Sequence, residues 1–303
     1  MRHRRFFLFT LLLLGAAALL YETDAVKAAV GDGLTLCLQS VIPSLFPFFV
    51  LSSLLISLGF AEAVGRRCEG LMRPLFHVGG AGASALILGL LGGYPVGAKT
   101  VAELYRDRLC TRTEAARLLA FCNNSSPAFV LGVLGTGIFH SRRAGLALWL
   151  IHVAAALVTG LLFRRWREDG HDGNTDAPSR RPCPVRAVSL PDAFVRSVRA
   201  GLSAMGAVCA FVVCFQVLLL PLRALPLPIG RPLLCLTELF HGATLLPDSP
   251  AGFLAAAGLL GWGGLSVHCQ TLSLLSDLSP KSYLLGKAAQ GLLSLLFAAA
   301  LLA

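Results

Sequence analysis

Charged residues are scarce in this chain. They make up 14% of its 303 residues, whereas soluble globular domains carry about 25%. Hydrophobic residues make up 55%, and the mean hydropathy is +0.72. Several apolar stretches approach the ~20 residues that a helix needs to cross a bilayer, and they lack the alternation of barrel strands. These features exclude a soluble fold and predict an all-α polytopic membrane protein.

Catalytic and metal-binding motifs are also missing. The sequence contains no H-E-x-x-H, G-x-S-x-G or Walker motif, and no obvious carboxylate pair in its apolar segments. None of its nine cysteines forms a C-x-x-C pair, and most lie within apolar stretches. We therefore expect no enzyme activity, no metal site and no cofactor.

The net charge of +10 is distributed in a way that argues against nucleic acid. The arginines lie in short segments beside apolar stretches, as the positive-inside rule expects of cytoplasmic loops. The expected partners are therefore the lipid bilayer and a small molecule, and a homo-oligomer is compatible with the sequence.

Composition divides the chain into five parts. The first thirty residues have a basic start followed by an apolar stretch, typical of a short transmembrane anchor or of a signal segment cleaved after Ala25; we favour the anchor. The predicted parts are the anchor (1–30), a first repeat (31–143), a connecting transmembrane helix (144–163), a cytoplasmic Arg-rich linker (164–199) and a second repeat (200–303).

The two repeats share short strings in the same order. Leu-Phe-His at 75–77 recurs at 239–241, and Gly-Leu-Leu-Gly at 89–92 recurs at 258–261. Each Gly-Leu-Leu-Gly string leads to a glycine-rich break, polar residues and a further apolar helix. Because the helix at 144–163 is an odd crossing, the second repeat is predicted to be inverted, and the two re-entrant hairpins enter from opposite sides. Their tips are expected near Gly93 and Gly263, and such inverted repeats with broken transmembrane helices are a transporter architecture.

The first break and the crossing segment after it carry two polar groups. At the first break, Gly93 allows a tight turn, Tyr94 offers a ring, and Lys99 adds a positive charge to a helix N-terminus that can bind an anion. Alternatively, Lys99 extends to the membrane interface from the end of the hairpin. The crossing segment 114–139 contains Asn123, Asn124, Ser125 and Ser126 before a proline. Because buried amides need partners, this cluster binds either a ligand or neighbouring helices.

The second repeat supplies the remaining candidates. Ser266, His268 and Gln270 follow the Gly-Gly turn of its break, and Lys287 and Gln290 lie one turn apart in the last helix. A lysine inside an apolar helix costs roughly 2.5–3.5 kcal/mol on insertion scales and is a functional candidate by default. We predict that all these side chains converge on one substrate site near the membrane midplane.

Three stretches resemble a known family. GLLGGYPVGAKTVAELYRDRL, LLAFCNNSSPAFVLGVLG and GLLGWGGLSVHCQ are similar to the YlbJ-type sporulation integral membrane proteins, which belong to the wider Gate or "nucleoside recognition" group. The resemblance covers about residues 30–303 and implies a Gate-like fold similar to concentrative nucleoside transporters. It also implies transport of dipicolinate, an aromatic dianion, across the outer forespore membrane.

These observations favour a secondary transporter of a small aromatic anion. The alternatives are a transporter of a neutral solute such as a nucleoside, and a non-transporting membrane assembly factor of sporulation. The two buried-segment lysines favour the anion, and the polar groups at both breaks argue against the assembly factor.

Overall fold

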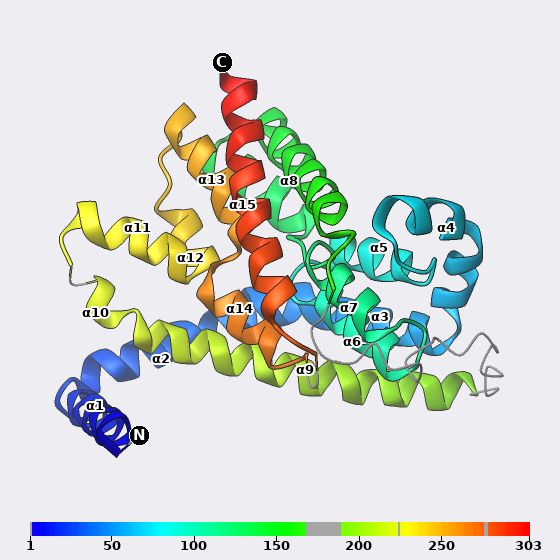
Figure 1. The fold of residues 1–303 in the computed structure, drawn as a ribbon. Helices are drawn as coiled ribbons and strands as arrows, with labels where there is room; N and C mark the ends of the chain where they lie inside the picture. The colour runs from blue at the N-terminus through cyan, green and yellow to red at the C-terminus, as the bar shows by residue number, and fades with distance from the viewer. Residues whose placement is uncertain (1, 168–188, 224, 276–277) are drawn as a thin grey trace.

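The structure is helical throughout its described part. A computed structural model of the chain describes residues 2–167, 189–223, 225–275 and 278–303 (Figure 1). Within these ranges it contains fifteen α-helices, two π-helices and no strand. The predicted all-α fold is confirmed.

The helices divide at the segment that follows α8. The first half contains α1 (Arg2–Tyr21), α2 (Thr23–Leu36), η1 (Cys37–Val41), α3 (Ile42–Ser57), α4 (Phe60–Phe76), α5 (Gly82–Gly92), α6 (Val96–Arg106), α7 (Arg112–Leu119), η2 (Ala128–Ile138) and α8 (Arg142–Phe163). The second half contains α9 (Leu190–Leu218), α10 (Leu220–Arg223), α11 (Leu227–Thr237), α12 (Leu239–Thr244), α13 (Pro250–Trp262), α14 (Gly264–Leu272) and α15 (Lys281–Leu302).

Four described segments are long and apolar enough to cross a membrane: α8, α9, α13 together with α14, and α15. A fifth crossing is possible if α3 and α4, which are bent by 77° at their junction, count as one broken span. The predicted helix at 144–163 corresponds to α8, and the predicted last helix, which holds Lys287 and Gln290, corresponds to α15. The chain is an integral membrane protein.

The first predicted hairpin is present. Helices α5 and α6 fold back on each other around Gly93, whose φ of +81° is a left-handed conformation that favours glycine. The two helices approach closely because Gly89 and Gly97 face each other without side chains. The side of the membrane from which this hairpin enters stays a prediction.

The second predicted hairpin is wrong. Helices α13 and α14 continue from one to the other across Gly263 and form a single candidate span of 23 residues. Gly263 and Gly264 have φ of +89° and +85°, which kinks the chain without reversing it. The neighbours explain the direction, because α13 packs along α15 and α8 whereas α14 reaches α9 and α11. The second half therefore has a broken helix where we expected a hairpin, and the inverted repeat stays a prediction.

Only one of the two repeated strings lies at corresponding positions in the two halves. Gly-Leu-Leu-Gly ends α5 in the first half and lies near the end of α13 in the second, so these two positions correspond. Leu75-Phe76-His77 closes α4, whereas Leu239-Phe240-His241 opens α12. That second match is therefore not structural.

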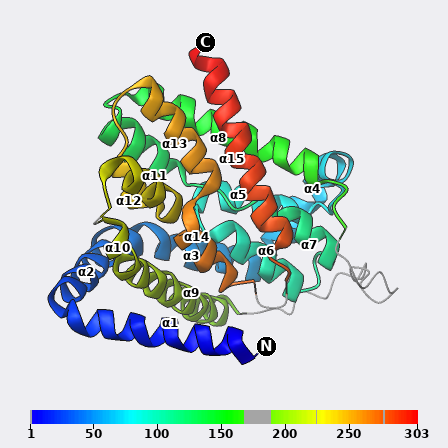
Figure 2. The same cartoon turned by 60° about the vertical axis from the view of Figure 1, so that its left-hand side comes forward.

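The segment between α8 and α9 is shorter than the linker predicted from the sequence. Helix α9 begins at Leu190 because Ser189 caps it by accepting the N–H of Asp192, and Pro191 suits the first turn. Helix α9 therefore begins within the predicted linker, whose central part (168–188) lies outside the described residues. The predicted anchor contains α1, which lies beside α2 at the far end of the molecule from the C-terminus (Figures 1 and 2).

Two apolar clusters form the core. The first contains residues from each of the helices α3 through α7, from α9 and from the start of α15. It includes Phe121 and Tyr283. The second joins η2, α8, α12, α13 and the end of α15, and includes Phe129 and Ala298. The break between α7 and η2 passes from the first cluster to the second, and so does α15. Polar side chains on these two segments therefore meet between the apolar clusters.

Candidate functional site

The break between α7 and η2 exposes backbone groups inside the protein. Residues 123–126 have poor helix propensity, and Pro127 follows them at the start of η2. Asn123 and Asn124 are fully buried. The break therefore presents freed carbonyl oxygens and amide side chains where an unbroken helix would hide its backbone.

Lys287 meets this break from α15. Its side chain is fully buried, and its Nζ donates to the Tyr94 hydroxyl (2.9 Å), the Asn123 carbonyl oxygen (3.1 Å) and Gln290 Oε1 (2.7 Å). The Tyr94 oxygen is free to accept because its own proton goes to the Leu260 carbonyl, 2.6 Å away. An ammonium has three N–H donors, so these contacts match the charged form of lysine.

Gln290 extends the network to a second asparagine. Its Nε2 donates to Asn124 Oδ1 (2.9 Å) and to the carbonyl oxygen of His152 on α8 (3.4 Å). The His152 ring accepts the Ser125 N–H at Nε2, 3.0 Å away. A ring nitrogen that accepts carries no proton, so neutral His152 holds its proton on Nδ1.

A second branch runs from Asn123 toward the other broken helix. Asn123 Nδ2 donates to Thr271 Oγ1 (3.0 Å), which lies 3.2 Å from the Tyr283 hydroxyl. That hydroxyl lies 2.9 Å from Nδ1 of His268, which packs edge-on against Trp262. The Asn123 side-chain oxygen also accepts the Ala98 N–H in the first turn of α6, at 3.4 Å.

The structure therefore brings together many of the side chains singled out in the sequence. Joined by these contacts are Tyr94, Asn123, Asn124, Ser125, His268, Lys287 and Gln290. Gly93 touches the same break, since a Cβ on it would lie 2.9 Å from Cβ of Ser126. The Ser126 hydroxyl accepts the N–H of Phe129 in the first turn of η2. The role of these residues as ligand contacts stays a prediction.

Three members of the network escaped the sequence analysis: His152, Thr271 and Tyr283. His152 and Tyr283 lie within helices that have no break beside them, so no local pattern distinguished them. Thr271 lies next to Gln270, which was selected, and extending the selection by one residue would have included it. Ser266 and Gln270 bond to each other on α14 at 3.1 Å.

Lys99 belongs to a different polar group. Its Nζ lies 2.7 Å from Glu103 Oε1 and also bonds the Ser53 hydroxyl of α3. Ser53 donates to the same Glu103 oxygen at 2.9 Å. A carboxylate thus compensates the charge of Lys99 within its own helix.

Lys287 has neutral acceptors instead. The ion pairs found among the described residues involve Lys27, Arg73 and Lys99. Two lysines are thus buried in the described parts of this chain, but only one of them has an acid partner there. None of these ion pairs involves Lys287, so its amino group is bonded to neutral oxygens.

The bond between Asn124 and Gln290 can be tested by a double-mutant cycle. We expect Asn124→Ala and Gln290→Leu to couple by about 0.5–3 kcal/mol in unfolding free energy, because they share a buried hydrogen bond. Denaturant unfolding in detergent measures the coupling. As a control, Asn124→Ala combined with Ser197→Ala should be additive, since the Ser197 hydroxyl donates to the Ala193 carbonyl of its own helix. Additive effects in the first pair would contradict the contact.

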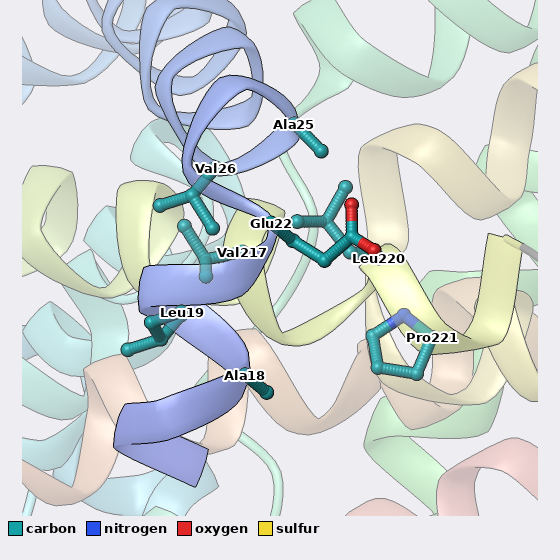
Figure 3. A pocket seen from close by; sticks show the side chains of 8 residues that line it. All are labelled: Ala18, Leu19, Glu22, Ala25, Val26, Val217, Leu220 and Pro221. Atoms are coloured by element: carbon teal, nitrogen blue, oxygen red, sulfur yellow. The ribbon is translucent and has the colours of Figure 1, made fainter.

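A separate cavity shares no lining residue with the Lys287 network. It has a volume of about 370 Å³ and lies between the α1–α2 junction and the α9–α10 junction (Figure 3). Its walls are apolar side chains such as Leu19, Val217 and Pro221, and its one charged lining residue is Glu22. A carboxylate repels anions, so this cavity suits the expected substrate less well than the Lys287 network.

Comparison with known proteins identifies the family of this chain. The Gate domain, described as nucleoside recognition, matches residues 38–141, which include the α5–α6 hairpin and the asparagine break. The "Sporulation integral membrane protein YlbJ" of Bacillus subtilis (strain 168) is 30% identical, and the match covers 96% of this chain and 80% of that protein. No solved structure gives a significant match. This chain therefore belongs to the YlbJ family of sporulation integral membrane proteins.

Proposed function

We propose that this protein is a secondary transporter of a small aromatic anion, with dipicolinate as the favoured substrate during spore formation. The observation that carries the proposal is the fully buried Lys287 amino group, which donates to three neutral oxygens. The sporulation context comes from the YlbJ relative. In this proposal the protein lies in the outer forespore membrane and performs no catalysis.

The charge of Lys287 favours an anion. A buried ion without a counter-ion is costly, and an opposite charge beside it recovers part of that cost. Hydrogen bonds between ammonium and carboxylate are roughly twice as strong as neutral ones. A substrate carboxylate that replaces the Tyr94 hydroxyl at Lys287 would gain this interaction.

The neighbouring side chains suit an aromatic ring. Tyr94 lies at the hairpin tip with its ring centroid 4.8 Å from Lys287 Nζ. Trp262 and Tyr283 both pack edge-on against His268. Aromatic side chains provide apolar surface for a ring, while the amides fix its orientation.

Transport requires the network to open. Tyr94 joins the hairpin tip to α13 through the Leu260 carbonyl and to α15 through Lys287. In this proposal these two bonds hold the site closed. We infer that substrate entry breaks them and moves the tip of the α5–α6 hairpin, as broken elements around a central site do in other transporters.

A nucleoside is the second candidate substrate. The description of the Gate domain as nucleoside recognition favours it, and so do the buried amides of Asn123, Asn124 and Gln290. Amides can pair with the hydrogen-bonding edges of a base. A nucleoside would nevertheless leave the charge of Lys287 without a partner.

Uptake into vesicles tests the proposal. Purified protein in liposomes should accumulate labelled dipicolinate above protein-free vesicles, and unlabelled dipicolinate should compete better than uridine. Saturable uptake of uridine that dipicolinate does not inhibit would favour the nucleoside. Absence of uptake for both, with correctly inserted protein, would favour the assembly factor.

A further inference from the structure

We propose that the Lys287 ammonium occupies a monovalent-cation site, so that the chain fills this site with its own cation. Three oxygens form this site: the Tyr94 hydroxyl, the Asn123 carbonyl and Gln290 Oε1. They come from the hairpin tip, the helix break and α15. Each is neutral, and each lies at 2.7–3.1 Å from Nζ.

The argument begins with the Asn123 carbonyl. Carbonyl oxygens freed where a transmembrane helix unwinds coordinate Na⁺ or H⁺ in transporters with broken helices. Oxygen atoms, including those of carbonyls, are also the ligands that hard cations prefer. Here such a carbonyl, together with two further oxygens, surrounds an ammonium that is tethered to α15. The ammonium and an alkali cation carry the same charge, so the side chain can replace the free ion.

Lys99 provides the contrast within the same chain. It is also buried, but its strongest contact is the carboxylate of Glu103. Its group is therefore an ordinary ion pair between neighbouring turns of one helix. At Lys287, by contrast, the acceptors are neutral oxygens. One of them is a backbone carbonyl at the helix break.

Because the ammonium fills this site, the stability of the wild-type protein should not depend on external cations there. Wild-type protein should gain no stability from Na⁺ or K⁺ at this site, because the ammonium already fills it. Lys287→Ala removes the ammonium and leaves the three oxygens around an empty space. Lys287→Met removes the charge but fills that space with an apolar chain of similar length, and it serves as the matched control.

Thermal unfolding of the purified full-length protein tests the proposal without any substrate. Melting temperatures are compared in NaCl, KCl, methylammonium chloride and N-methyl-D-glucamine chloride, at constant pH and ionic strength. For Lys287→Ala we expect Na⁺, K⁺ or methylammonium to raise the melting temperature by about 2–4 °C over N-methyl-D-glucamine. Wild type and Lys287→Met should show no such difference.

Two outcomes would overturn the proposal. One is a cation response of wild type as large as that of Lys287→Ala. The other is a Lys287→Ala protein that no small cation stabilises, including one that fails to fold in all four salts while Lys287→Met folds. A second measurement uses wild-type vesicles, whose dipicolinate uptake should be unchanged when N-methyl-D-glucamine replaces Na⁺; a requirement for Na⁺ would also overturn the proposal.

Only the result expected for dipicolinate uptake rests on the proposed function. Melting temperatures report cation binding even if the substrate is not dipicolinate. Absence of uptake by wild type would therefore contradict the transporter, whereas absence of a cation response in Lys287→Ala would contradict the cation site.

Discussion

Lys287→Met should weaken dipicolinate binding by about 30- to 4,000-fold. Removing one partner from a desolvated, hydrogen-bonded charge pair costs about 2–5 kcal/mol, and every 1.4 kcal/mol is tenfold in affinity. Methionine retains the length of the side chain and removes its charge. Calorimetric titration of purified protein measures the loss, with the amount of folded protein matched between variants.

Lys99→Met is the matched control for this prediction. Both lysines are buried, but Glu103 already compensates the charge of Lys99. We therefore expect Lys99→Met to change affinity less than tenfold and to act mainly on stability, because it leaves the Glu103 carboxylate without its cation. A large loss in Lys99→Met with full affinity in Lys287→Met would instead support the role that the sequence suggested for Lys99.

Gly97→Ala should prevent the hairpin from packing against the asparagine break. A Cβ at Gly97 would overlap the Cys122 carbonyl oxygen and lie 3.1 Å from Cα of Asn123. Both obstacles are backbone atoms, so the hairpin itself must move. Overpacking of this kind typically costs about 1–3 kcal/mol and occasionally more. We expect a clear fall in melting temperature and a loss of substrate affinity.

The control for this prediction is a glycine with free space. Gly206 in α9 has no neighbouring atom within 4 Å of an added Cβ. Gly206→Ala should therefore be neutral or stabilising, since alanine favours a helix over glycine by about 1 kcal/mol. Equal effects of the two substitutions would contradict the close packing of hairpin and break.

The helices and their breaks could be predicted because their signals are local. Long apolar stretches identify α8 and α15, and Asn123 to Pro127 interrupt a crossing segment with residues that disfavour a helix. Whether the second break forms a hairpin or a kink depends instead on packing between distant helices. Gly263 and Gly264 permit either a hairpin or a kink, and the contacts of α14 with α9 and α11 select the kink.

The candidate site was predictable where it coincides with a break. Tyr94, Asn123 and His268 were found because glycine or proline lies nearby. His152 was missed because it approaches the break from an unbroken helix, which only the fold reveals. The pairing of Lys99 with Glu103 was missed, although residues four apart share one face of a helix.

An experimental structure with bound dipicolinate tests the central claim most directly. The measured quantity is the distance from Lys287 Nζ to the nearest carboxylate oxygen of the ligand. We predict a contact of about 2.7–2.9 Å, as in other charged hydrogen bonds of this kind, with the Tyr94 hydroxyl displaced from Lys287. A ligand bound at Lys99 or in the cavity beside Glu22, with Lys287 still on its three protein oxygens, would contradict the claim.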